Sequence, residues 1–222
     1  MARPIVFGEC TLKMSGNAAN TVDPANTNQA DILQAVAPKD IDLGGDVSLI
    51  FGVKGCQVRI KAQKALLSMV SNYFRALFSQ GFSEGSKPAS EALELDEDEP
   101  DAIVSLMAIL HMRYTGPMPM TTLEIVSLAV VTDKYDCVKA VRLSLDALFP
   151  AIATDMSATD MVRLAVAAYL LDYPGMFTKA TLKLITYYRT AIPQLVELDI
   201  AQRIPFKAWR KLTLLAPCSL PY

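Results

Sequence analysis

Apolar and polar residues alternate along an early part of the chain, as they do in strands with one buried face. The alternation runs through residues 46–51 and 57–61, with a connection containing two glycines at residues 52–55, and it returns briefly at residues 92–95. Strict alternation predicts strands, and a short glycine-bounded connection between two of them predicts a hairpin. We therefore expect a hairpin and a third, shorter strand.

A different spacing, with apolar residues three or four positions apart, dominates the rest of the chain. This spacing predicts helices at residues 64–70, 72–79, 101–112, 122–131, 136–148, 158–171, 175–189 and 205–215. Ser71 interrupts the first pair, and its hydroxyl can accept a hydrogen bond from the first turn of the second helix. Pro100 stands in the first turn of the third helix, where its missing N–H costs nothing. Because the strands come early and the helices follow without regular strand–helix alternation, the order predicts an α+β fold.

Residues 1–40 lack both patterns over most of their length. Residues 16–28 are small and polar and offer little to bury, so we expect a flexible N-terminal arm. Residues 30–36 are the exception, because three of their apolar side chains can share one face of a short helix.

Composition and charge narrow the class of protein. Residues of the set AVILMFWYC make up 52% of the chain, which supports a large core and leaves some apolar surface for a partner. The net charge of −2 gives no electrostatic reason to expect nucleic acid or an anionic membrane as the main partner. The cysteines are far apart, no secretory leader is recognised, and no apolar run approaches the ~20 residues of a membrane span. We therefore expect an intracellular protein of the cytoplasm, the nucleus or both.

The residues that could carry chemistry do not form a catalytic or metal-binding pattern. His111 is the single histidine and lies in an apolar run, so we expect a hydrogen-bonded structural residue and no catalytic triad or three-ligand zinc site. The acidic run at residues 94–101 lacks the glycine and glutamate spacing of a calcium loop and is better explained by the preference of a helix N-terminus for negative charge. No glycine-rich phosphate-binding motif occurs. The sequence therefore predicts no enzyme, cofactor, metal or small-molecule substrate.

Five stretches in a fixed order point to a known family. Because of these stretches, the chain resembles the BTB/POZ domain family and looks most like the fungal proteins that carry this domain. The stretches are GDVSLI at 45–50, KALLSMVSNYFRALF at 64–78, GFSEG at 81–85, LELDEDEPDAIVSLMAILHMR at 93–113 and LAVVTDKYDCVKAVR at 128–142. The residues that we take as the structural signature are Asp46, Ser71, Tyr73, Phe74, Phe78, Asp133, Lys134 and Tyr135. One departure is Gln63, where many members carry histidine.

The resemblance implies a fold and a general function. The fold is a small sheet flanked by a helical cluster at residues 42–150, followed by a helical extension at residues 151–222. The function is protein–protein interaction without catalysis, by a module that dimerises or acts as a scaffold, so a second copy of this chain is an expected partner.

Two alternatives stay open beside this function. Some members are substrate adaptors for cullin-based ubiquitin ligases, and in them a hydrophobic residue, any residue and an acidic residue follow the helical pair. Phe82-Ser83-Glu84 fits this pattern, so Phe82 and Glu84 are the expected partner-binding residues and a cullin scaffold is a possible partner. The other alternative is a transcription- or chromatin-associated scaffold without direct DNA contact.

Overall fold

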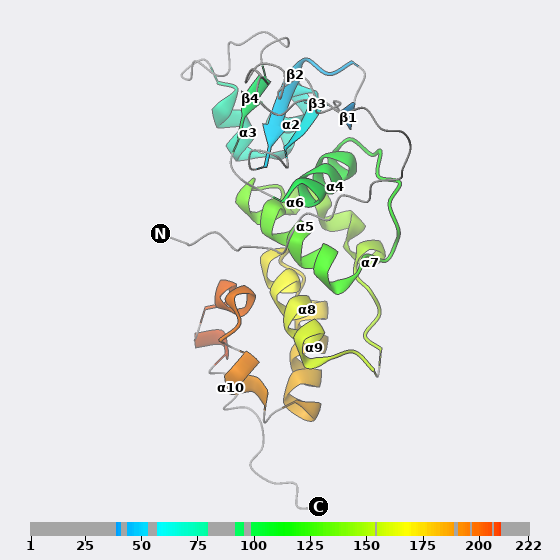
Figure 1. Cartoon of the computed structure of the whole chain (residues 1–222), viewed down its shortest axis with the longest axis vertical. Helices are drawn as coiled ribbons and strands as arrows, with labels where there is room; N and C mark the ends of the chain where they lie inside the picture. The colour runs from blue at the N-terminus through cyan, green and yellow to red at the C-terminus, as the bar shows by residue number, and fades with distance from the viewer. Residues whose placement is uncertain are drawn as a thin grey trace, which may run out of the picture.

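The computed structural model describes a sheet and the helices packed beneath it (Figure 1). The described residues are 39–40, 44–52, 57–79, 92–95, 99–153, 155–188, 191–195, 197–205 and 207–209. Most of the expected arm, its helix at residues 30–36, and the candidate contact residues Phe82 and Glu84 lie outside the described residues.

The sheet has four strands in the order β1-β3-β2-β4. β2 (Val47–Phe51) and β3 (Val58–Ala62) are antiparallel, with Leu49 opposite Ile60, so the predicted strand pair is confirmed. β4 (Ala92–Glu94) joins β2 in parallel, as the third expected strand. β1 (Lys39–Asp40) pairs in parallel with β3 and was not predicted, because two residues carry no periodic signal.

The helical pair that follows the sheet begins and ends close to the predicted residues. α2 spans Lys64–Val70 and α3 spans Asn72–Leu77. Ser71 separates them, and its hydroxyl oxygen accepts a hydrogen bond from the backbone N–H of Phe74 at 3.0 Å. The predicted N-cap is confirmed, and it explains why two short helices replace one long helix.

Two longer helices, α4 and α5, pack against each other after the sheet. α4 (Pro100–Leu110) has its proline in the first turn, as expected. α5 (Thr122–Lys134) begins with a capping box in which Thr121 and Glu124 satisfy each other's backbone N–H groups. It continues three residues beyond the predicted end at residue 131, because its apolar positions extend to the buried Tyr135.

The prediction of one helix over residues 136–148 is wrong. The structure has α6 (Val138–Val141), a 3₁₀ turn η2 (Arg142–Ser144) and α7 (Leu145–Leu148) in its place. Asp136 has a φ of 51°, and the N–H of Cys137 bonds back to the carbonyl of Thr132 at 2.9 Å. This left-handed turn closes the C-terminus of α5, so the next helix cannot begin at Asp136.

α8 (Ala158–Leu170) and α9 (Pro174–Tyr187) form the C-terminal helical region together with α10 (Ile192–Leu195) and the 3₁₀ helix η4 (Asp199–Arg203). The predicted helices at residues 158–171 and 175–189 correspond to α8 and α9, whereas α10 and η4 were not predicted. Of the expected helix at residues 205–215, residues 207–209 are helical and most of the remainder lies outside the described residues.

α8 is the central helix of this region. It packs against α5, α9 and η4, and Figure 1 shows it directly below α5. Its buried apolar side chains are Met161, Val162, Leu164, Ala165, Val166, Ala167 and Ala168. One continuous hydrophobic core therefore runs from the sheet through α5 into the C-terminal helices.

A polar contact reinforces this packing at the N-terminal ends of α5 and α8. The Thr122 hydroxyl donates to the Asp160 carboxylate at 2.5 Å. Asp160 also completes the capping box of α8 with Ser157 and accepts a hydrogen bond from Arg163 at 3.1 Å. These donors, the Thr122 hydroxyl first, hold the pKa of Asp160 below its ordinary value of 3.8 against the opposing effect of partial burial.

Replacing Ser71 with alanine should lower the free energy of unfolding by about 1–2 kcal/mol, because α3 loses its N-cap. Urea denaturation followed by circular dichroism measures the change. Ser68→Ala, in the neighbouring helix, is the matched control and should shift the free energy by less than about 0.5 kcal/mol. An equal effect of both changes would contradict the capping role of Ser71.

Replacing Asp160 with asparagine should destabilise the protein most at neutral pH. Because the pKa of Asp160 is lower when the chain is folded, its ionised form stabilises the fold above pH 3.8, and this contribution is lost as the pH falls through the lowered folded-state pKa. The difference in unfolding free energy between wild type and Asp160→Asn should therefore shrink below about pH 4. Asp172→Asn, whose side chain is 78% exposed, serves as the control. A difference that stays constant from pH 7 to pH 3 would contradict the assignment.

Candidate interaction surface

Tyr135 is the centre of an aromatic cluster that joins three parts of the fold. Its ring is fully buried and stacks on Phe74 of α3, with centroids 5.2 Å apart and planes 7° apart. The edges of Phe51 from β2 and Tyr73 from α3 approach it at centroid distances of 5.9 and 5.0 Å. Strand, helical pair and the C-terminus of α5 are therefore fixed to one another at this residue.

Polar contacts complete the cluster. The Ser71 hydroxyl donates to the carbonyl oxygen of Tyr135 at 2.6 Å, and the Cys137 thiol lies 3.3 Å from the same oxygen. Burial, opposed by the hydrogen bond from Ser71, raises the pKa of Cys137 to about 12. The thiol is therefore protonated at neutral pH and is not a nucleophile.

The structure brings most of the predicted signature residues together here. Besides Ser71, Tyr73, Phe74 and Tyr135, the cluster includes Phe78, which stacks on Phe74 at 5.9 Å, and Lys134, whose ammonium lies 5.5 Å from the centre of the Tyr135 ring. A cation at this distance from a ring face is attracted to it.

Two of the signature residues have other positions. Asp46 accepts a hydrogen bond from the backbone N–H of Lys64 at 2.7 Å, so it caps the start of α2 from the beginning of the sheet. Asp133 is exposed, and desolvation raises its pKa, with Arg203 opposing and Asp136 adding to the effect. Arg203 belongs to η4, so a charge of the C-terminal helical region acts on the pKa of Asp133.

Tyr73 lies at the edge of the aromatic cluster. Although its ring takes part in the cluster, 37% of its surface is exposed. One side of its ring covers Phe74 and Tyr135, while the rest of the side chain faces outward. A tyrosine at the edge of a core buries its ring and keeps its hydroxyl near water.

A second exposed apolar side chain lies on the helical pair. Met69, near the end of α2, is 70% exposed. The Arg75 guanidinium bonds to the carbonyls of Ser68 and Met69 and to the Asn72 side chain, which in turn donates to the Asp136 carboxylate. We call the resulting patch the junction surface, formed by Met69, Asn72, Tyr73, Arg75, Lys134 and Asp136.

The sequence interpretation missed several residues of this surface, namely Met69, Asn72, Arg75 and Asp136. A signal for Met69 was available: it stands two positions after the buried Leu67, which places it on the opposite side of a helix. No local signal identifies Asn72 and Asp136 as partners, because they lie 64 residues apart in the chain.

His111 is the structural residue that the sequence predicted. The backbone N–H of Gln63 lies 3.3 Å from its Nε2 atom, so Nε2 accepts and Nδ1 donates to the carbonyl of Met107 at 2.8 Å. The residue is 8% exposed. Nδ1 therefore bonds back within α4, and Nε2 connects the end of α4 to the residue that precedes α2.

Two further findings concern the described residues alone. Within them, no group of three or more His, Cys, Asp or Glu side chains could hold a metal ion. None of their helices is both long enough and apolar enough to cross a membrane.

Comparison with known families identifies the domain that contains the sheet and the first helices. Residues 44–149 match the family model of the BTB/POZ domain, a domain that generally mediates protein–protein interaction and is generally not enzymatic. No curated protein matches the chain, so the likeness to fungal members stays a prediction. The sheet, the capped helical pair and the α4–α5 pair all lie within the matched residues. Residues 44–149 are thus a BTB/POZ domain, which a helical C-terminal region follows.

Proposed function

We propose that the chain is a non-catalytic interaction module that binds a protein partner through the junction surface, with a second copy of the chain as its first partner. The observation that carries this proposal is that the helical pair exposes two apolar side chains, Met69 and Tyr73. The polar side chains Asn72, Arg75 and Asp136 bond to one another on the same surface, and we take the two apolar residues as the centre of an interface and the polar ones as its rim. Protein interfaces have this arrangement of apolar core and polar rim.

The rigidity of the surface supports the proposal. The Tyr73 ring rests against Phe74 and Tyr135, and Arg75 is held by hydrogen bonds to three groups of the helical pair. A side chain that is already ordered loses little entropy when a partner binds. Tyrosine and arginine are also the residue types that dominate binding energy at interfaces, and methionine adapts to the shape of a partner.

The continuous core supports a scaffolding role for the whole chain. We divide it into an N-terminal arm at residues 1–40, the domain at 42–150 and an extension at 151–222. Because α8 is buried between α5 and α9, the extension is held against the domain. We place the protein inside the cell, in the cytoplasm, the nucleus or both, with protein partners and without direct binding to nucleic acid, membrane or a small-molecule substrate.

The cullin adaptor remains the alternative and depends on Phe82-Ser83-Glu84, which follows the helical pair in the sequence but lies outside the described residues. A role as a transcription- or chromatin-associated scaffold is a further alternative. In this role the chain would not contact DNA directly, because its net charge of −2 gives no electrostatic attraction to the phosphates.

Sedimentation velocity at tens of micromolar should show a dimer that dissociates on Met69→Glu. A charge at the apolar centre should weaken dimerisation by about tenfold or more, which corresponds to about 1.4 kcal/mol. Leu143→Glu is the matched control, because Leu143 is 99% exposed on η2, and it should leave the dimer intact. A monomeric wild type would refute dimerisation, and a dimer unaffected by Met69→Glu would exclude the junction surface as its interface.

The cullin alternative predicts that purified wild-type protein captures a cullin scaffold in a pull-down and that Glu84→Arg weakens this capture. Charge reversal should weaken the contact because it removes the acidic residue of the motif. The new arginine would also repel a basic group of the cullin that pairs with the acidic residue. Absence of binding by the wild type, or binding that Glu84→Arg does not change, would eliminate the adaptor role.

A further inference from the structure

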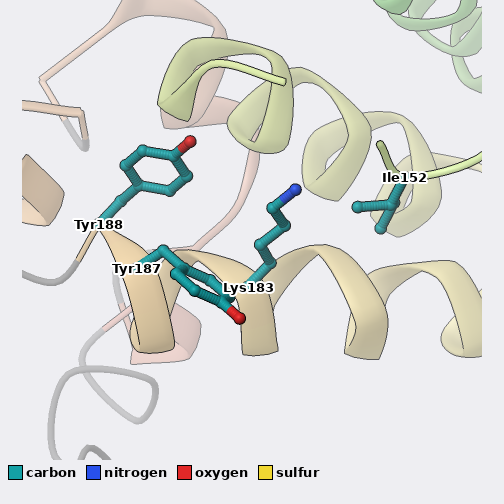
Figure 2. Close-up of a pocket in the computed structure, with 4 residues that line it drawn as sticks. All are labelled: Ile152, Lys183, Tyr187 and Tyr188. Atoms are coloured by element: carbon teal, nitrogen blue, oxygen red, sulfur yellow. The ribbon is translucent and has the colours of Figure 1, made fainter. Parts of the chain in front are cut away.

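A cleft opens in the C-terminal helical region, outside the residues that match the BTB/POZ model. Its volume is about 500 Å³, and it is lined by Ile152, Lys183, Tyr187 and Tyr188 (Figure 2). Ligand sites in proteins generally enclose roughly 300–1,000 Å³. The volume of the cleft therefore suits one or two amino-acid side chains of a partner.

Hydrogen bonds hold the walls of the cleft in place. The Tyr188 hydroxyl donates to the carbonyl of Met156 at 2.7 Å, and the Lys183 ammonium donates to the carbonyl of Ala153. Both bonds tie the C-terminal end of α9 to the segment between α7 and α8. The cleft is therefore formed before any ligand arrives, which reduces the entropic cost of binding.

The apolar part of the cleft lies open to solvent. Tyr187, which lines the cleft, is 72% exposed. Tyr187 stands four positions after Lys183, so the two side chains are neighbours on the helix surface. Aromatic and aliphatic walls of this kind, Tyr187 with Ile152, accept an apolar side chain.

The charge of the cleft is positive. Among the described residues that line it, Lys183 carries a charge. Lys179 is exposed one turn earlier on α9 and makes no ion pair or hydrogen bond within the described part of the chain. Asp155 lies in the facing segment but forms no ion pair with Lys183. Lysine has three N–H donors, so Lys183 can accept an anionic ligand while it keeps its bond to Ala153.

From this geometry we propose that the cleft binds an acidic peptide segment of a partner protein. An aromatic or aliphatic side chain of the segment packs in the cleft against Tyr187, and a neighbouring carboxylate pairs with Lys183 and Lys179. The proposal concerns a surface separate from the junction surface and does not require the chain to dimerise.

Selection of a displayed library of random octapeptides on the full-length protein tests this proposal. We expect enrichment of sequences with Asp or Glu next to an aromatic or aliphatic residue. A fluorescein-labelled copy of the most enriched peptide is then titrated by fluorescence anisotropy. Its binding should weaken about tenfold on Tyr187→Ala and up to about fivefold on Lys179→Gln, which removes an exposed charge without breaking the Lys183 bond.

Matched controls separate the cleft from the general surface. Tyr169→Ala removes another exposed tyrosine, 42% exposed on α8, and Lys139→Gln removes an exposed lysine of α6. Both should leave the affinity unchanged within about twofold. Lys179→Glu combined with a peptide whose acidic residues are replaced by lysine should restore part of the lost affinity.

Three outcomes would overturn the assignment. The first is a selection without acidic enrichment, and the second is an enriched peptide that binds the Tyr187→Ala protein as well as it binds wild type. The third is binding of free N-acetylphenylalanine as tight as that of the peptide, which would indicate a small-molecule site. Thermal unfolding of each variant should match wild type, so that a loss of binding is not a loss of folding.

Discussion

The structure depends first on the burial of Tyr135 at the C-terminal end of α5. Its ring contacts Phe51 from the sheet and Phe74 from the helical pair, and its carbonyl oxygen accepts the Ser71 hydroxyl. A large aromatic side chain contributes substantial buried area, and a hydrogen bond to its backbone fixes its position. Because three elements meet at one residue, the orientation of α3, and with it the shape of the junction surface, follows from this contact.

The second constraint is the position of α8. Its side chains are buried on several sides at once, against α5, α9 and η4, and such a helix cannot be exposed to water without a large loss of hydrophobic free energy. The C-terminal helices therefore belong to the same core as the BTB/POZ domain. The Thr122–Asp160 hydrogen bond adds a directional contact to this packing, since a hydrophobic surface alone does not fix register.

The fold that these two constraints determine exposes two surfaces of different chemical composition. The junction surface exposes Met69 and Tyr73 and contains charges of both signs, whereas the cleft beside α9 combines two tyrosines with Lys183. Each includes side chains that hydrogen bonds or ring contacts hold in place, Tyr73 and Arg75 in the first and Lys183 and Tyr188 in the second. In our proposals the two surfaces bind different partners, and a chain that holds two proteins at fixed positions acts as a scaffold.

Local signals in the sequence determined a large part of the fold. The bounds of α2, the cap at Ser71 and the proline at the start of α4 were predicted correctly, because helix caps and periodicity depend on residues a few positions apart. The position of His111 as a buried, hydrogen-bonded residue followed from the apolar run around it. The order of strands and helices was also sufficient to predict an α+β fold.

Features set by distant neighbours were decided by the tertiary structure alone. The left-handed turn at Asp136, which replaced the expected helix, and the exposure of Tyr73 both depend on how α5 meets the helical pair. The cleft forms where Lys183 meets Ala153, 30 residues earlier in the chain. Periodicity shows which side of a helix is apolar, but only packing against the other elements shows which apolar residues remain in contact with water.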